Sequence, residues 1–273
     1  MPQDWLNLTT HRLDIYNEEF AKTQFLEDFT NLFKQNISDT PALENLPTAY
    51  DYIRLGHPLS CILEWTIANL THQNPENIIC FSSKTMPILA ILRKNVFERK
   101  KTQILYTDEI PNFFNSEIVK NIYGYQFDFK KIESLEKVEK FEGSTIFIHQ
   151  NEEICNFETN STIDFFINYN NQLGSILLIN GDKNKHYISD IQHIRRRETI
   201  AMTPTNTLIA LQALVSKNTI HWDNTEISSD KKIVLDTIKR ITGTSIKPLV
   251  ASSGLSMQYA IMMGLIDDAQ DNH

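Results

Sequence analysis

The sequence predicts an α/β protein of three layers, in which a mainly parallel sheet is flanked by helices. Between residues 77 and 190, short β-prone runs alternate with segments of helical spacing. The β-prone runs are largely apolar, as is typical of parallel strands that are buried on both faces. We expect an N-terminal helical arm over residues 1–48, an α/β core over 49–198 and a short C-terminal extension over 199–273 that packs on the core.

Short runs of aliphatic, aromatic and β-branched residues predict the strands of the core. They are residues 77–81, 102–106, 125–129, 144–148 and 175–180. Apolar residues at helical spacing predict helices between the strands, and such connections form right-handed crossovers. These helices are expected at residues 86–97, 115–123, 132–138 and 162–173, the last of them ending before Gly174.

The segments outside this alternation are expected to be mostly helical. Phenylalanines and leucines recur at helical spacing between residues 20 and 33, which predicts an amphipathic helix. Pro58 fits the first turn of a helix that runs to residue 70. Another helix is expected at 208–215, and residues 246–264 have the pattern of a strand, a glycine turn and an apolar segment.

The composition is that of a globular protein and argues against several functions. Of the 273 residues, 41% are hydrophobic and 22% are charged, which is ordinary for a soluble domain. The formal net charge of -8 disfavours binding to nucleic acid or to an anionic membrane through charge. No apolar run approaches the roughly 20 residues of a membrane span, and the N-terminus lacks the pattern of a secretory signal.

The cysteines, histidines and glycines argue against several classes of cofactor and metal chemistry. Cys61, Cys80 and Cys155 are an odd number without metal-ligand spacing, so we expect buried thiols and a cytoplasmic location. His186 and His193 have no acidic partner at zinc-like spacing, so no metal site is expected. With only 8 glycines, the dinucleotide fingerprint and the phosphate loop are both missing, which argues against NAD-dependent and P-loop chemistry.

An unusual cluster precedes the helix that begins at Pro58. It consists of Tyr50, Tyr52, Arg54 and Gly56. Tyrosine hydroxyls and a guanidinium group can bind an anion, often a phosphate. The alternative interpretation is a tyrosine-rich packing loop with a surface arginine.

Ser82 and Ser83 follow the first expected strand and would lie at the start of a helix, where anions bind. Together with the cluster before Pro58 and the pair Leu63 and Glu64, this order resembles the opening of fold type I pyridoxal-phosphate enzymes. The nearest similarity is to cystathionine synthases and lyases. The resemblance covers residues 49–190, and the later strands and helices follow the same order.

The resemblance implies a role in cofactor binding for six residues. Tyr52 and Arg54 would reach the cofactor phosphate of a neighbouring subunit, and Ser82 and Ser83 would contribute to the phosphate site. Lys84 stands where the family has a glycine. The family's aspartate at the end of the apolar strand corresponds most closely to Asp182, since the strand itself ends in Asn180. The implied cofactor-binding residues are therefore Tyr52, Arg54, Ser82, Ser83, Lys84 and Asp182.

The chain departs from the family at its reactive lysine. The Ser/Thr-rich segment that carries the Schiff-base lysine has no counterpart after Asp190, and Lys183 and Lys185 lie too early to match it. Without that lysine the usual chemistry lacks its covalent anchor. The first hypothesis is therefore a degenerate relative, a pseudoenzyme that binds either no cofactor or pyridoxal phosphate. It would be a homo-oligomer or a non-catalytic partner of a larger enzyme.

A second resemblance, to thiolase-fold ketosynthases, rests on the tail over residues 246–264. It implies that Cys61 is the acyl-accepting nucleophile and that His149 and Asn151 belong to the histidine loop. A reactive thiolate needs an imidazole or a helix N-terminus beside it. The opening helices of this chain argue against that fold.

Two charged groups and one further hypothesis complete the expectations. Arg195, Arg196 and Arg197 form a basic patch, which is either a solvated helix face or a contact for an anionic ligand or a carrier protein. Glu152, Glu153 and Glu158 follow an expected strand and could do acid–base work. The third hypothesis is a plain protein-interaction domain, which predicts no pocket lined by Tyr52, Arg54 and Ser82.

Overall fold

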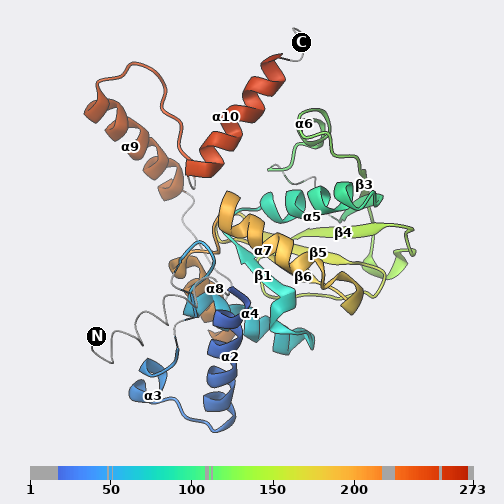
Figure 1. Ribbon diagram of the computed structural model, residues 1–273, viewed down its shortest axis with the longest axis vertical. Coiled ribbons are helices and arrows are strands. Elements are labelled where there is room, and N and C mark those ends of the chain that lie inside the picture. The colour runs from blue at the N-terminus through green and yellow to red at the C-terminus, as the bar shows by residue number, and fades with distance from the viewer. Residues whose placement is uncertain are drawn as a thin grey trace, which may run out of the picture.

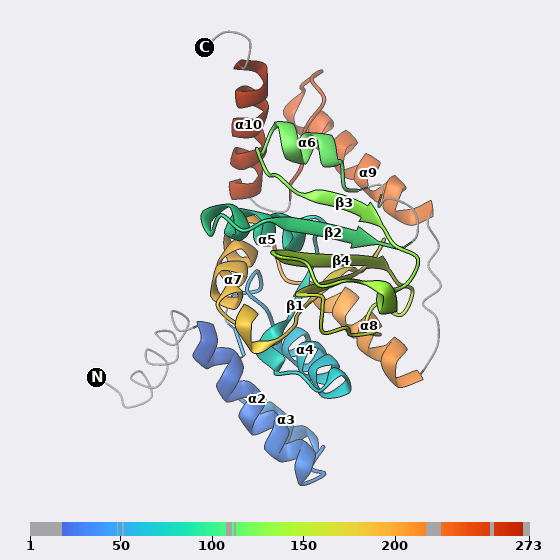
Figure 2. The same ribbon diagram turned by 90° about the vertical axis from the view of Figure 1, so that its right-hand side faces the viewer.

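The computed structural model describes residues 18–47, 49–50, 52–107, 111, 113–216, 225–251 and 254–269. A six-stranded sheet forms its middle layer, and helices cover both faces (Figure 1 and Figure 2). Helices α5 (Met86–Phe97) and α7 (Tyr187–Glu198) pack together on one face. Helices α4 (Pro58–Thr71) and α8 (Pro204–Ser216) pack together on the other face. The predicted three-layer α/β architecture is confirmed.

The sheet is mixed but mostly parallel. Its strands are β1 (Ile78–Phe81), β2 (Thr102–Tyr106), β3 (Asp128–Lys131), β4 (Ser144–Gln150), β5 (Phe165–Asn170) and β6 (Gly174–Ile179). Their order in the sheet is β1-β6-β5-β4-β2-β3. Strand β6 is antiparallel to both of its neighbours, β1 and β5, so these two point the same way. The remaining neighbours, β5, β4, β2 and β3, are parallel to one another.

Successive strand residues feed two separate apolar layers because side chains alternate across a sheet. Ile104 and Ile146 pack in the layer under α5 and α7. Leu105 and Phe147 pack in the layer under α4 and α8. All three cysteines are free and buried, as expected from the sequence.

The remaining helices lie around this core. They are α2 (Glu18–Lys34), α3 (Thr40–Glu44), α6 (Ser116–Asn121), α9 (Thr225–Thr242) and α10 (Gly254–Ala269). The expected amphipathic helix of the N-terminal arm is α2. Its Phe25 is buried in a small cluster with Cys61 of α4, and the ring of Phe29 meets Trp65 edge-on at 5.3 Å. Among the described residues, no helix combines the length and the apolar character that crossing a bilayer requires.

The expected helix over residues 162–173 is wrong. Residues 165–170 form β5, which turns directly into β6 as an antiparallel hairpin. Phe165, Phe166, Ile167 and Tyr169 are aromatic and β-branched residues that suit a strand buried on both faces. Asn170 stabilises the turn. Its side-chain oxygen accepts hydrogen bonds from the N–H groups of Gln172 and Leu173, at 3.0 and 3.3 Å.

Smaller differences also follow from pairing and packing. The third strand lies at Asp128–Lys131 rather than 125–129, where it pairs in register with β2. The helix expected at 132–138 is a single 3-10 turn, Leu135–Lys137. Residues 246–251 form no strand, and residues 254–269 are helix α10. The described part of the tail therefore lacks the hairpin on which the ketosynthase resemblance rested.

Candidate functional site at the carboxyl edge of the sheet

Strands β1, β2, β4 and β5 point the same way, so their carboxyl ends meet at one edge of the sheet. This is the edge at which open α/β sheets bind ligands. Ser82, Ser83 and Lys84 follow β1, Thr107 follows β2, and His149 lies near the end of β4. The structure thus brings Ser82, Ser83, Lys84 and His149, which were predicted from the sequence, to this edge of the sheet.

The N–H and hydroxyl groups of Ser82 are both hydrogen-bonded within the chain. The Ser82 N–H donates to the carbonyl oxygen of Ile200 at 3.2 Å, and its hydroxyl donates to the carbonyl oxygen of Ala201 at 2.7 Å. The Ala201 N–H in turn donates to the carbonyl oxygen of Arg54 at 2.9 Å. The segment between α7 and α8 therefore lies between the Tyr52–Arg54 loop and the end of β1, and it holds them together.

Ser83 is used in the same way by helix α5. Its hydroxyl oxygen accepts the N–H groups of Thr85 and Met86 at 3.3 and 3.1 Å. These amides belong to the first turn of the helix, where they would otherwise be available to an anion. The Ser83 carbonyl oxygen accepts the Ser175 hydroxyl at 2.6 Å. Both serines of the predicted phosphate site are thus engaged by their own chain.

The cluster before Pro58 is a packed loop. The guanidinium carbon of Arg54 lies 4.7 Å from the centre of the Tyr52 ring, an intramolecular cation–π contact. The Tyr50 ring lies against Gly56, where a Cβ would be 2.6 Å from two ring carbons. Gly56 is therefore required for close packing. His57 caps α4, and its Nε2 lies 2.8 Å from the carbonyl oxygen of Met202.

Lys84 is the half-buried cation at this edge. Its Nζ donates to Oδ1 of Asn171 in the β5–β6 turn at 3.1 Å and lies 5.3 Å from the centre of the Phe113 ring. Phe113 in turn meets Tyr169 edge-on at 4.7 Å. Desolvation lowers the pKa of Lys84 below the ordinary value of a lysine, because burial disfavours its charged form.

A polar cavity of about 320 Å³ opens on the opposite face of the sheet, next to the ends of β2 and β4. Thr107, His149, Asn151, Glu158 and Asn168 are among the residues that line it. Nδ1 of His149 lies 3.4 Å from the Thr107 hydroxyl, and the imidazole stacks on Phe147 at 5.9 Å. Two of the three residues of the acyl-transfer hypothesis, His149 and Asn151, meet in this cavity.

The third, Cys61, lies elsewhere. It is fully buried in α4, in the cluster with Phe25, Leu26 and Ala49. Burial, and after it the negative charge of Glu64, raises the pKa of the Cys61 thiol to about 12. The structure therefore places the thiol apart from His149 and gives it the surroundings of a packing residue.

Asp182 is not brought together with the other predicted cofactor residues. Strand β6 runs against its neighbours, so its end, opposite the start of β5, lies at the amino edge of the sheet. Asp182 is 91% exposed there and pairs with Lys185 at 2.8 Å. The buried carboxylate at that edge is Asp164, which accepts the Thr145 N–H at 2.8 Å and pairs with Lys183 at 2.6 Å.

A buried ion cluster, which the sequence interpretation missed, links four elements. Glu64 of α4 pairs with Lys22 of α2 at 2.6 Å and with Arg195 of α7 at 2.8 Å, and it accepts the Cys80 N–H of β1 at 2.9 Å. Burial by itself would raise the pKa of Glu64, but the charges of Lys22 and Arg195 outweigh it and lower this pKa to about 2. Glu64 is therefore an ionised structural carboxylate.

Arg195 does not face solvent, because its side chain is 0% exposed. Its position could have been inferred from the spacing of Ile191, Ile194 and Arg195, which fall on the buried face of α7. Arg197 is exposed and Arg196 is half-buried. A continuous patch of three arginines is therefore not present on the surface.

The six residues that the resemblance assigns to pyridoxal phosphate do not form one site within this chain. The hydrogen-bonding groups of Ser82 and Ser83 have internal partners, Arg54 lies on Tyr52, and Asp182 lies at the other edge of the sheet. In the described parts of the chain, no three histidine, cysteine or carboxylate side chains come together as a metal site.

Comparison with known proteins shows similarity to solved structures alone. No protein-family model matches the chain, and no curated protein sequence matches it. It is similar to metB of Corynebacterium glutamicum, with 12% identity, 63% of this chain and 55% of that chain covered, and a TM-score of 0.39. It is also similar to cystathionine γ-lyase of Lactobacillus plantarum in complex with L-serine, with 11% identity, 60% and 53% covered, and a TM-score of 0.37.

A third similar structure is a Listeria monocytogenes protein assigned as an L-allo-threonine aldolase, with 12% identity, 74% and 71% covered, and a TM-score of 0.41. The chain spans about half of the length of the first two structures.

Proposed function

We propose that this chain is a pyridoxal-phosphate-enzyme-like scaffold that does not carry the cofactor's chemistry and works as a non-catalytic subunit of an assembly. One observation carries the proposal. The groups at the end of β1 that would hold a phosphate are hydrogen-bonded to the segment around Ile200 and Ala201.

A phosphate at this place would have to displace a backbone segment. It would break the bonds from Ser82 to Ile200 and Ala201, and with them the bond from Ala201 to Arg54. Buried backbone groups without a partner cost free energy, so displacement is unfavourable unless each group finds a new partner. This supports a scaffold in which the anion site has been replaced by internal packing.

Lys84 is the residue against which this proposal must be tested. Its lowered pKa makes the neutral amine, the form that reacts with an aldehyde, more accessible than in an exposed lysine. However, it directly follows β1, whereas the lysine of the resembled family lies in a later segment. We expect Lys84 to keep its contact with Asn171 and not to act as a covalent anchor.

Purified protein mixed with pyridoxal phosphate should show no specific aldimine band that borohydride fixes onto one lysine. The measurement is an absorption spectrum before and after reduction, followed by peptide mass spectrometry. Lys84→Arg is the matched control and should behave like the unsubstituted protein, with the same low scattered labelling of exposed lysines. A stoichiometric label on Lys84 that is lost in Lys84→Arg would overturn the non-catalytic assignment.

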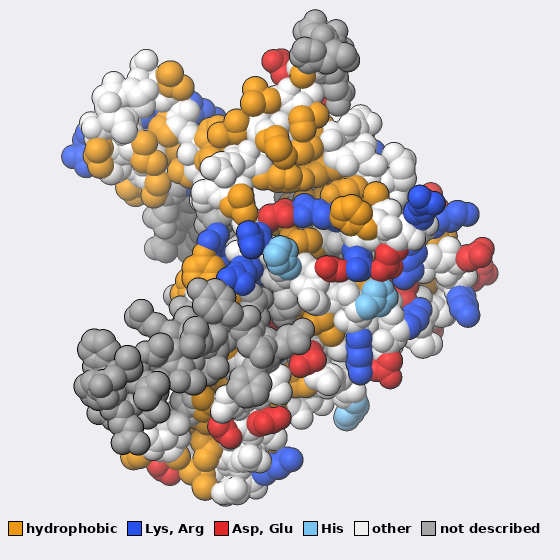
Figure 3. All heavy atoms as spheres, viewed as in Figure 1, with side chains coloured by type: hydrophobic (Ala, Val, Ile, Leu, Met, Phe, Trp, Pro, Cys, Tyr) orange, Lys and Arg blue, Asp and Glu red, His pale blue; other side chains and the backbone are white. Residues whose placement is uncertain are grey.

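The C-terminal helices supply the surface for assembly. Helix α10 contacts the core at two residues. The Ser256 hydroxyl donates to the Glu198 carbonyl oxygen, and the ring centre of Tyr259 lies 6.0 Å from that of Tyr123. Figure 3 shows exposed hydrophobic side chains over α9 and α10. The large apolar side chains exposed on these two helices are Ile233, Val234, Ile241, Leu255, Ile261, Met262, Leu265 and Ile266.

We take the partner of this surface to be a second copy of the chain. The described side chains of α9 include Lys231, Lys232, Lys239 and Arg240, whereas α10 carries only the acidic pair at 267–268. Each copy therefore presents both signs of charge beside apolar area, and a two-fold interface requires such self-complementarity. Exposed apolar area of this kind marks an association surface.

Analytical ultracentrifugation should show a dimer or larger homo-oligomer. Leu265→Glu combined with Ile266→Glu should shift the equilibrium toward the monomer and raise the Kd of self-association at least about tenfold. Both residues are exposed, so the charges should leave the fold intact. Leu43→Glu on α3 is the control, since Leu43 is similarly exposed but lies outside the two helices. A monomeric parent protein would remove self-association from the proposal.

A further inference from the structure

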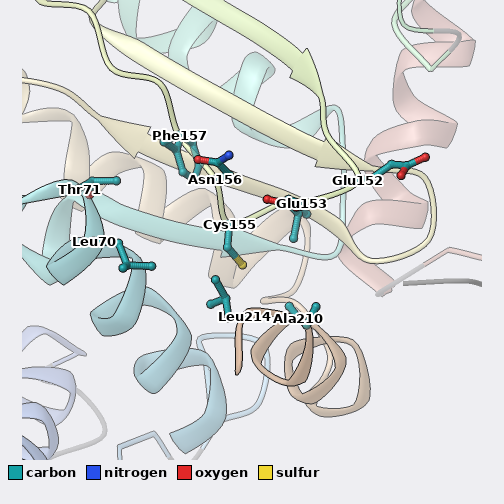
Figure 4. Close-up of a pocket in the computed structure, with 11 residues that line it drawn as sticks. Leu70, Thr71, Glu152, Glu153, Cys155, Asn156, Phe157, Ala210 and Leu214 are labelled. Carbon is teal, nitrogen blue, oxygen red and sulfur yellow. The ribbon is translucent and has the colours of Figure 1, made fainter. Parts of the chain in front are cut away.

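A second cavity lies beside the loop that follows β4. It has a volume of about 460 Å³, within the range of small-molecule sites. The loop over residues 152–157 forms one wall, the end of α4 another and α8 a third (Figure 4). Its apolar lining includes Leu70, Cys155, Phe157, Ala210, Ala213 and Leu214.

The interior of this cavity is mainly apolar, and its polar lining residues apart from the two glutamates are Thr71 and Asn156. Cys155 points toward Ala210 and Leu214 (Figure 4). Burial raises the pKa of its thiol to about 12, so Cys155 is an uncharged wall residue. The Thr71 hydroxyl donates within its own helix to the carbonyl oxygen of Ile67 at 2.8 Å. An apolar group entering the cavity would therefore displace water mainly from apolar walls.

The mouth of the cavity differs from its interior. Glu152 and Glu153 line it and are exposed, and within the described parts of the chain neither forms an ion pair. Figure 4 places Glu153 at the cavity and Glu152 further out along the loop. Leu70, on the rim, is 61% exposed. The cavity thus combines an apolar interior with a carboxylate mouth on a protein of net charge -8.

We propose that this cavity binds a small apolar amine, with its hydrocarbon part against Cys155 and Leu214 and its ammonium group toward Glu153 at the mouth. The apolar walls select a hydrocarbon body, and ligand sites of this kind use a few polar groups at fixed positions for orientation. The two carboxylates disfavour a carboxylate or phosphate head group through like-charge repulsion. This proposal does not depend on whether the chain binds pyridoxal phosphate, because neither Ser82 nor Lys84 lines the cavity.

Three probes of one length test the proposal: hexylamine, hexanol and hexanoate, each added to the full chain and followed by calorimetry and by saturation-transfer NMR. We expect hexylamine to bind most tightly, hexanol more weakly and hexanoate most weakly, with the amine at least about tenfold tighter than the carboxylate. Equal binding of the three probes, tighter binding of hexanoate, or no binding of any probe overturns the proposal.

A pair of single variants and one double variant locate the site. Ala213→Phe fills the cavity from α8 and should weaken hexylamine at least about tenfold. Gln212→Phe adds the same side chain at the neighbouring exposed position and should leave binding unchanged. Glu152→Gln with Glu153→Gln should weaken hexylamine but not hexanol. If Ala213→Phe and Gln212→Phe bind hexylamine alike, or the double glutamine variant weakens both probes alike, the assignment fails.

Discussion

Glu64→Gln should lower the free energy of unfolding by about 3 to 5 kcal/mol, the usual cost of leaving a buried charge without its partner. Glu64 is the one carboxylate between Lys22 and Arg195, whose side chains are 4% and 0% exposed. A neutral amide would leave both cations in the interior without a counter-charge. Urea denaturation followed by circular dichroism measures the loss.

Glu133→Gln is the control for this prediction. Glu133 pairs with Lys137 at 2.9 Å, but the two side chains are 85% and 73% exposed. Exposed ion pairs contribute little, so a change below about 1 kcal/mol is expected. A loss at Glu64 as small as the loss at Glu133 would mean that the buried cluster contributes no more than a surface pair.

The same cluster makes stability depend on acid. The pKa of Glu64 is lowered to about 2 in the folded protein, against an ordinary value of 4.5. A lowered pKa gives stability that is present above the unfolded value and is lost as the pH falls. The contribution of Glu64 should therefore be complete above pH 4.5 and decline from there toward pH 2. Glu64→Gln should lack this part of the acid dependence.

Gly174→Ala should destabilise the protein by about 3 kcal/mol or more, since backbone strain and a clash act together. Gly174 begins β6 with a φ of +117°, a conformation that side chains rarely allow. A Cβ there would lie 2.2 Å from the carbonyl oxygen of Phe81 and 3.1 Å from the Cα of Ser82. Either β1 or the β5–β6 hairpin would have to move.

Gly124→Ala separates strain from crowding. Gly124 also has a positive φ, of +71°, but a Cβ there would meet nothing within 4 Å. Its cost should be limited to the conformational penalty of about 1 to 2 kcal/mol. Thermal unfolding measures the loss of stability in both variants. Equal losses would show that the close approach of residue 174 to the Phe81 carbonyl oxygen adds nothing to the cost of the backbone strain.

Elements set by local pattern could be predicted from the sequence. The expected helix at 86–97 is α5, the expected strand at 102–106 is β2, and Pro58 opens α4. In each, the residues that decide lie within one helix or one strand, and both helices also carry a proline in their first turn. The family resemblance rested on the order of such elements along the chain.

Features that depend on partners far along the chain required the tertiary structure. The segment at 165–170 has residues that suit either a buried helix or a buried strand, and its pairing with β4 and β6 decides for the strand. Because β6 runs against its neighbours, Asp182 falls at the opposite edge from Ser82. A one-dimensional pattern contains no information about strand direction.

The candidate site shows the same division. The sequence places Ser82 after a strand and Arg195 in a basic run, and both observations suggest anion binding. In the folded protein, Ser82 is hydrogen-bonded to the backbone of residues 200–201. Arg195 is paired with Glu64, which lies 131 positions away in the sequence. Local chemistry determines which groups can bind a charge. Long-range packing determines whether those groups remain available, because buried polar groups must be satisfied by whatever lies beside them.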